Sequence, residues 1–147
     1  MQDPNANDLT TYLVSCVSKK QAAAACAKDL YVSEWFLRVR RYVEATGCPW
    51  FILSAKYGLI DPNQIIAPYE QTLNTMGVSE RHKWAYRVQA QMAIRLLPAH
   101  RVVIFAGQRY REFLMDYLER FAVTVQIPLE GLRIGEQLSW LEHHAAR

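Results

Sequence analysis

The chain has 147 residues, a length that suits one domain of ordinary size. Hydrophobic residues make up 51% of it and charged residues 21%, which predicts a folded protein and excludes a disordered chain. The net charge is +3, from 17 basic and 14 acidic residues, so a polyanionic partner is permitted but not implied.

The cysteines and the apolar runs narrow the class of protein further. Cys16, Cys26 and Cys48 are widely spaced and form no CxxC pair, which argues against a disulfide framework and a zinc site and favours a reducing compartment. No apolar run is long enough for a membrane span, and residues 1–10 are polar. We therefore expect no membrane association and a cytoplasmic location.

The first half of the chain predicts two strands joined by a helix. Residues 1–10 are expected to be a flexible N-terminus, followed by a single α/β domain over 11–147. The short, β-branched run Thr11–Cys16 predicts a buried strand, and Val17–Leu30 a polar connection. Ser33 suits the N-cap of a helix that ends near Thr46, with Gly47 as its stop. Trp50–Ser54 predicts a second strand, apolar at almost every position.

The second half repeats the alternation. Ala55–Asn74 is expected to be a long ordered loop. The elements that follow are a helix capped by Ser79, a strand, the most strongly periodic helix of the chain, a strand and a last helix that buries Ile134, Leu138 and Leu141. Their predicted ranges are Glu80–Leu97, Arg101–Ala106, Tyr110–Phe121, Ala122–Ile127 and Leu132–His144.

Strands that alternate with helices predict a three-layer, Rossmann-like α/β fold. The sheet should be mostly parallel with four to five strands and helices on both faces, and the four predicted strands should be parallel neighbours. Sheets of this kind bind ligands outside the carboxyl ends of their strands. Candidate site residues are therefore sought directly after each strand.

Hydroxyl, thiol and ammonium groups follow the first strand. Ser15, Cys16 and Lys19, with Lys20 beside it, could hold an anion such as phosphate or carboxylate. Alternatively, Ser15 bonds a neighbouring loop, Cys16 is a small buried residue and the lysines are solvated. This stretch is neither a Walker A nor a GxGxxG loop.

The segment after the second strand contains the candidate catalytic residues. Ser54 ends the strand, and Lys56 and Tyr57 stand where substrate is expected; Lys56 could neutralise a phosphate, and Tyr57 could donate a proton or stack on a base. Glu70, next to Tyr69, could be a general acid or base or a ribose ligand. The alternatives are that Tyr57 packs in the core and that Lys56 and Glu70 form a simple ion pair.

Glycines follow the last two strands. Gly107 could let a ligand or another backbone come close, or it could simply form a helix-start turn. Gly131 and Gly135 could expose backbone amides to an anion at a helix N-terminus. Glu136 could contact a ligand there or cap the helix itself. The four histidines form no metal pattern, so neither a metal nor a cofactor is expected.

These residues resemble a family of small bacterial and phage domains of unknown function. The resemblance covers nearly the whole chain and is carried by SAKYGLI at 54–60, PYE at 68–70 and LEGLRIGEQL at 129–138, where Arg133 replaces a usual glycine. The YGLI and PYE parts are also similar to the YaaA-type peroxide-stress proteins, which are associated with DNA. A more distant similarity is to the accessory domain of archaeosine synthase, an enzyme of deazaguanine modification in transfer RNA. These relatives imply work near nucleobases or nucleic acid.

Two main functions are therefore expected. The first is an enzyme, a hydrolase or transferase that acts on a nucleotide, nucleoside or modified nucleobase through N-glycosidic or base-modification chemistry. In it Lys19 and Lys56 hold the anionic part, Tyr57 and Tyr69 contact the base, and Glu70 is the acid/base or a ribose ligand. The alternative is a non-catalytic module that binds a nucleotide or nucleic acid, and a third option is a partner-binding domain. The expected partner is a nucleotide-like small molecule or a nucleic acid.

Overall fold

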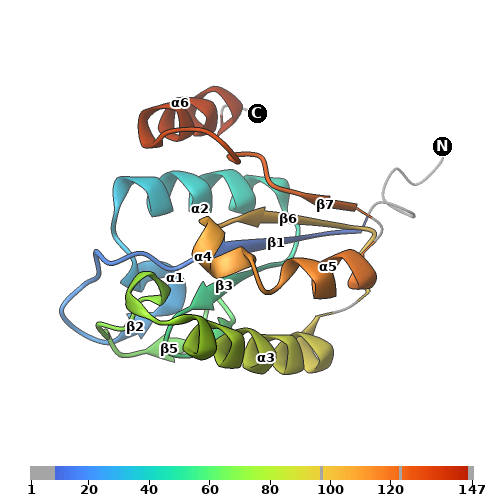
Figure 1. The fold of residues 1–147 in the computed structure, drawn as a ribbon. Coiled ribbons are helices and arrows are strands. Elements are labelled where there is room, and N and C mark those ends of the chain that lie inside the picture. Colours follow the sequence, from blue (N-terminus) through green and yellow to red (C-terminus); the bar gives the residue numbers. More distant parts are fainter. Residues whose placement is uncertain (1–8, 97, 123, 146–147) are drawn as a thin grey trace.

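A five-stranded, mostly parallel sheet forms the centre of the molecule (Figure 1). The computed structural model describes residues 9–96, 98–122 and 124–145, so residues 1–8 of the expected flexible N-terminus lie outside it. The strand order is β4-β3-β1-β6-β7. The bounds are β1 Thr10–Ser15, β3 Trp50–Ser54, β4 Gly58–Ile60, β6 Arg101–Phe105 and β7 Thr124–Gln126. β1 pairs in parallel with β3 and β6, and β6 with β7, which confirms the predicted parallel neighbours; β4 is antiparallel to β3.

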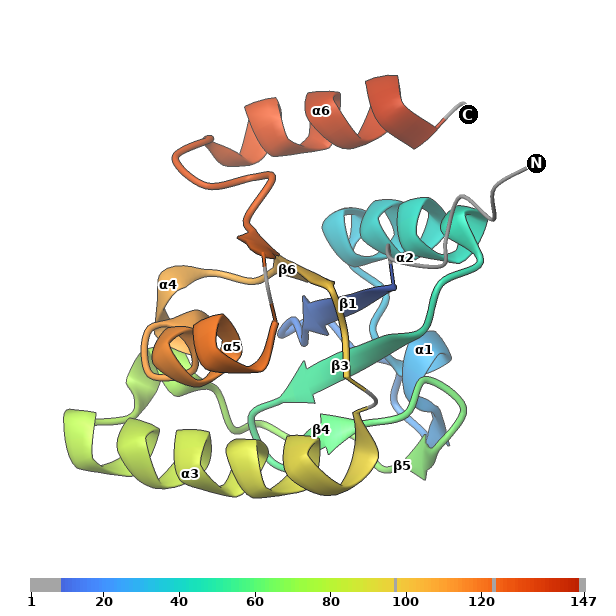
Figure 2. The same cartoon turned by 90° about the vertical axis from the view of Figure 1, so that its right-hand side faces the viewer.

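Helices cover both faces of this sheet, which confirms the three-layer α/β fold. Figures 1 and 2 show α2 (Glu34–Thr46) on one face and α3 (Val78–Arg95) with α5 (Met115–Phe121) on the other. Helix α6 (Ile134–Ala145) packs on the outer side of α2, where Trp35 donates to Gln137 Oε1 at 2.8 Å. Trp140 of α6 also lies against Phe105 of β6, with 6.2 Å between the ring centroids. Ile134, the first residue of α6, is 61% exposed, contrary to the prediction, whereas Leu141 is buried as expected.

The helix ends of α2 follow directly from the sequence. The Ser33 side chain accepts a hydrogen bond from the Phe36 amide, and Gly47 closes the helix at φ 73°. The inner face carries Phe36, Val39 and Val43, all fully buried against the sheet. In the centre of the sheet Leu13, Val14 and Ile104 are also fully buried, as expected for strands covered on both faces.

Two segments that were expected to be plain connections contain secondary structure. After β3 the chain turns back at once into β4, so residues 55–74 begin with a β-hairpin, continue through β5 (Ile65–Ile66) and end in a 3₁₀ turn at Leu73–Thr75. Residues 17–30 contain β2 (Ala25–Cys26) and the short helix α1 (Ala27–Leu30). β2 and β5 pair antiparallel, although they are far apart in the sequence. Each has only two residues, which is too short for an alternation of apolar and polar residues to predict it.

The predicted helix Tyr110–Phe121 is broken. It forms α4 (Gln108–Arg111) and α5, separated by a tight turn in which the Leu114 amide bonds the Arg111 carbonyl at 3.0 Å. The interruption positions Glu112 to pair with the buried Arg81 at 2.8 Å and Phe113 to stack on His82. Helix α3 likewise begins at Val78 rather than after Ser79, because Glu80 bonds the Gly77 amide; the predicted end at Leu97 lies outside the described residues.

Candidate functional site

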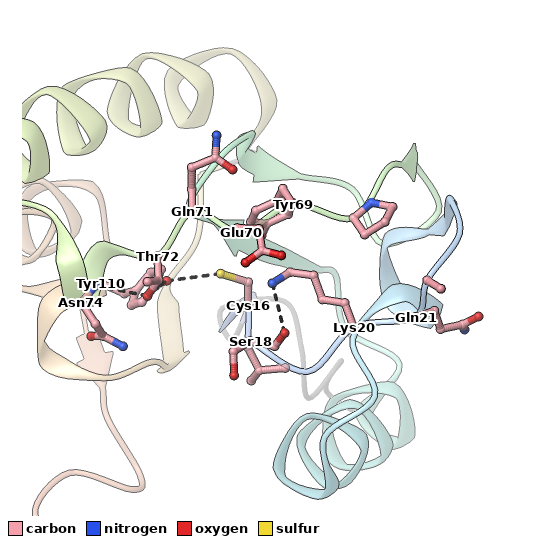
Figure 3. A pocket seen from close by; sticks show the side chains of 13 residues that line it. Cys16, Ser18, Lys20, Gln21, Tyr69, Glu70, Gln71, Thr72, Asn74 and Tyr110 are labelled. Atoms are coloured by element: carbon pink, nitrogen blue, oxygen red, sulfur yellow. Dashed lines mark hydrogen bonds between the residues drawn. The ribbon is translucent and has the colours of Figure 1, made fainter.

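A cavity lies where the strand order changes direction. From β1 the chain continues to β3 on one side, and the later strand β6 lies on the other, which is the position at which open α/β sheets bind ligands. The cavity measures about 590 Å³ and receives residues from the end of β1, the loop before the 3₁₀ turn and α4 (Figure 3). Its lining residues are Cys16, Val17, Ser18, Lys20, Gln21, Ala22, Pro68, Tyr69, Glu70, Gln71, Thr72, Asn74 and Tyr110.

Cys16 and Tyr110 form one side of this cavity. The Cys16 amide continues the pairing of β1 with a 2.9 Å bond to the Leu53 carbonyl, and its thiol donates to the Tyr110 hydroxyl oxygen at 3.4 Å. The same oxygen accepts a hydrogen bond from the Leu73 amide at 3.3 Å. Burial raises the pKa of Tyr110 above its usual value, so its hydroxyl stays protonated. Tyr110 thus joins the ends of β1 and α4 to the loop that carries Thr72.

A chain of buried hydroxyl groups lies behind the cavity. Ser54 donates to the Tyr69 hydroxyl at 2.8 Å, and the hydroxyls of Tyr69 and Tyr31 lie 2.6 Å apart. The Ser54 oxygen also accepts from the amides of Lys56 and Tyr57, which shapes the β3–β4 turn. Burial raises the pKa of both Tyr31 and Tyr69, so both phenols remain neutral hydrogen-bonding groups.

Lys20 points into the cavity over these rings. A backbone bridge between Lys20 and Tyr31 places the Lys20 ammonium 4.4 Å from the Tyr69 ring centroid and 5.8 Å from that of Tyr31. Burial lowers the pKa of Lys20, an effect opposed by the nearby Cys16 and Glu70. Figure 3 shows the Lys20 amino group and the Glu70 carboxylate facing each other in the cavity beside Cys16. They form no ion pair within 4.0 Å, so both charges remain available to a ligand between them.

Comparison with known protein families identifies one that includes this chain. The model of a family of unknown function, DUF6884, matches residues 11–143. The chain belongs to this family. No curated protein and no solved structure matches the chain significantly. The DUF6884 description states no activity, so the function has to be argued from the site.

Six of the predicted site residues of this DUF6884 chain are distributed over three different hollows. Cys16, Tyr69 and Glu70 line the cavity, whereas Lys56 lines a neighbouring hollow of about 430 Å³ and Gly107 and Gly131 a third of about 210 Å³. Since all four lie at or after the carboxyl ends of strands, Ser15, Ser54, Lys56 and Gly131 would be expected to line one cavity, but they do not. Ser15 and Ser54 are buried, and the hollows of Lys56 and Gly131 are separated because the strands that precede them lie on opposite sides of β1.

The ion pair between Lys56 and Glu70, one of the alternatives that the sequence left open, is absent, since neither residue has a partner within ion-pair distance in the described part of the chain. The Lys56 ammonium instead lies 5.3 Å from the centroid of its neighbour Tyr57. Tyr57 is half-buried, with its ring edge-on to Tyr69 at 5.6 Å. Tyr57 therefore supports the wall of the cavity from behind rather than lining it.

The residues at the start of α6 have a local explanation. Glu136 accepts a hydrogen bond from the Arg133 amide at 2.8 Å, so it occupies the helix N-terminus itself, the alternative that the sequence left open. Gly135 lies exposed in the first turn of the same helix. Neither residue lines the large cavity.

Tyr110 was not among the candidates drawn from the sequence, and Lys20 was named beside Lys19 but given no role of its own. Lys19 and Lys20 are adjacent, but in an extended segment neighbouring side chains point to opposite sides. The bridge to Tyr31 turns Lys20 inward and leaves Lys19 exposed. Tyr110 was taken only as part of a helical apolar stripe. A tyrosine hydroxyl that is buried needs a hydrogen-bond partner, and this requirement could have marked Tyr110 as more than an apolar residue.

The described residues 9–96, 98–122 and 124–145 contain no cluster of His, Cys, Asp and Glu side chains that could hold a metal ion. In the same ranges, no helix combines the length and apolar character that crossing a membrane requires.

Proposed function

We propose that this protein binds a nucleoside or nucleotide in the cavity at the carboxyl edge of the sheet. We further propose that it acts on the base or its N-glycosidic bond, as a hydrolase or transferase. The observation that carries the proposal is the facing pair of Lys20 and Glu70 above Cys16, at the point where the strand order reverses (Figure 3).

The size and lining of the cavity favour a small polar ligand. About 590 Å³ lies in the range of small-molecule sites, roughly 300–1,000 Å³. The amide side chain of Asn74 can donate and accept hydrogen bonds, as the edge of a nucleobase requires. The Lys20 ammonium suits a phosphate, and the Glu70 carboxylate suits a ribose hydroxyl. A purely apolar ligand would leave all these groups unpaired.

The same groups can move protons. A lowered pKa gives Lys20 a larger neutral fraction than an ordinary lysine, which suits a proton acceptor. The Glu70 carboxyl group can then act as the second acid/base group of the site. Tyr110, whose hydroxyl lies at the cavity wall, keeps its proton and can donate a hydrogen bond to a developing negative charge. These roles replace those expected for Lys56 and Tyr57, which lie outside the cavity.

The sequence resemblances support the ligand class. The SAKYGLI segment forms the β3–β4 turn behind the cavity, and the PYE segment contributes Pro68, Tyr69 and Glu70 to its lining. The similarity to YaaA-type proteins and to the accessory domain of archaeosine synthase thus falls on the residues that build the site. The proposal keeps the expected cytoplasmic location, in which Cys16 stays a free thiol.

Calorimetric titration with the common nucleosides and their monophosphates tests the proposal. Lys20→Met is expected to weaken the binding of a monophosphate by about tenfold, as loss of a charge-assisted contact does. Lys19→Met is the matched control, because Lys19 is exposed and lies outside the cavity; its affinity should stay within about twofold of wild type. Equal effects of the two changes, or no binding of any compound, would overturn the proposal.

Mass spectrometry of the incubated ligands then separates the enzyme from the alternative. A released base or a base of changed mass supports catalysis, and Glu70→Gln should abolish it while binding is retained. Binding without any product would instead establish the non-catalytic nucleotide- or nucleic-acid-binding module.

A further inference from the structure

A second, strongly basic hollow lies beside the cavity. It measures about 430 Å³ and is lined by Ala55, Lys56, Gln71, Met76, Glu80, Lys83, Trp84 and Arg87. Gln71 lines both spaces, so the hollow and the cavity are adjacent. In Figure 3 the Gln71 side chain points away from Lys20. The hollow therefore adjoins the cavity at Gln71.

Three cations of this hollow have no carboxylate partner within ion-pair distance among the described residues. Lys56, Lys83 and Arg87 are all exposed, and Arg87 donates to the Lys56 carbonyl oxygen at 2.9 Å, which holds the β3–β4 turn against α3. The one carboxylate in the lining, Glu80, accepts from the Gly77 amide at the start of α3.

Other basic residues of the molecule are used differently. Arg38, Arg40, Arg81 and Arg111 each pair with at least one Asp or Glu. Lys83 and Arg87, in contrast, are like charges four residues apart on α3, an arrangement that disfavours a helix. A bound anion would remove this repulsion.

We propose that the nucleotide in the cavity belongs to a single-stranded nucleic acid, whose neighbouring phosphodiester is bound by Lys56, Lys83 and Arg87. The proposal rests on the proposed function of the cavity and names its substrate class. A free mononucleotide carries its phosphate at one place, where Lys20 is sufficient. A second group of cations, separated from the cavity by Gln71, can be engaged only by a ligand that continues beyond one nucleotide. A single strand is required because a base can enter the cavity only when it is unpaired.

The test measures two affinities for each protein, one for a nucleoside monophosphate and one for a fluorescent single-stranded octanucleotide of DNA or RNA. The double variant Lys83→Gln/Arg87→Gln should weaken octanucleotide binding at least tenfold and leave monophosphate binding within about twofold. The slope of log affinity against log salt should become shallower by about 0.7, since one bound phosphate of a single strand contributes roughly that amount. Lys56→Gln should lower the slope by about half as much. Arg41→Gln, an exposed cation on α2, is the control and should change neither affinity.

The outcomes separate this inference from the proposed function. If monophosphates bind but the octanucleotide binds no more tightly, or if the double variant leaves the salt slope unchanged, the inference is overturned and the proposed function stands. If no monophosphate binds wild type, both fail. A poly-glutamate peptide that binds as tightly as the octanucleotide would show a general polyanion surface and would also overturn the inference. Melting curves confirm that each variant is folded.

Discussion

The ammonium group of Lys20 lies 4.4 Å from the ring centroid of Tyr69, while the hydroxyl of that ring is bonded to Ser54 and Tyr31 in the core. One side chain therefore offers an aromatic face to the cavity and a polar end to the buried interior. A cation over an aromatic face is stabilised by the ring quadrupole. The position of Lys20 in the site consequently depends on a hydroxyl network that no ligand touches.

Tyr69→Phe tests the structural part of this relationship. The ring and its contact with Lys20 are kept, but the fully buried Tyr31 hydroxyl loses its partner. An unsatisfied buried hydroxyl is expected to lower the free energy of unfolding by about 1–3 kcal/mol, as measured by urea denaturation. Tyr57→Phe is the control, since its hydroxyl lies only at 3.5 Å from the Ala67 carbonyl; it should cost about 0.5 kcal/mol or less. Equal losses would mean that the hydroxyl chain does not stabilise the fold.

Stability should fall as the pH rises above 10. Burial raises the pKa of Tyr31, Tyr69 and Tyr110 above 10.0, so the folded protein keeps three protons that the unfolded chain releases at that pH. The unfolded state then binds fewer protons, and the free energy of unfolding decreases by about 1.4 kcal/mol per pH unit for each tyrosine.

Lys20 has the opposite sign over a lower range of pH. The pKa of Lys20 is below 10.5 in the folded protein. The free energy of unfolding therefore increases as the pH rises from the folded pKa to 10.5, and Lys20 causes no further change above that pH. Urea denaturation between pH 8 and 11 measures the sum. Tyr69→Phe should show a shallower fall above pH 10, and a flat profile between pH 10 and 11 would contradict the burial of these phenols.

Gly58→Ala is expected to be more destabilising than the same change at Gly131. Both glycines have positive φ, 77° and 80°, which costs an alanine about 1–2 kcal/mol. At Gly58 an added Cβ would also lie 2.2 Å from the Gln91 side-chain oxygen, which bonds the Leu59 amide, whereas nothing lies within 4 Å at Gly131. Gly77→Ala, with negative φ and open space, is the control. Thermal denaturation ranks the three, and equal shifts at Gly58 and Gly131 would show that Gln91 yields freely.

The order of the elements could be predicted from the sequence because it depends on local patterns. Continuous apolar runs such as Trp50–Ser54 are typical of strands buried on both faces, and Ser33 and Gly47 mark the ends of α2 by their own chemistry. Parallel pairing follows once helix-length connections separate the strands. The location of the site at the carboxyl edge follows from the same alternation.

Which side chains meet at that edge was decided by tertiary structure. Lys20 rather than Lys19 enters the cavity because a bridge to Tyr31, 11 positions along the chain, sets the direction of the extended segment. Lys56 is directed to another hollow because the β3–β4 turn is held by Ser54 and Arg87. The periodic stretch Tyr110–Phe121 breaks where Glu112 meets Arg81 on α3. By itself the sequence determined the strands, the caps and the edge that carries the site, because each depends on neighbouring residues; the partners of Lys20, Lys56 and Glu112 are distant in sequence, and only folding brings them into contact.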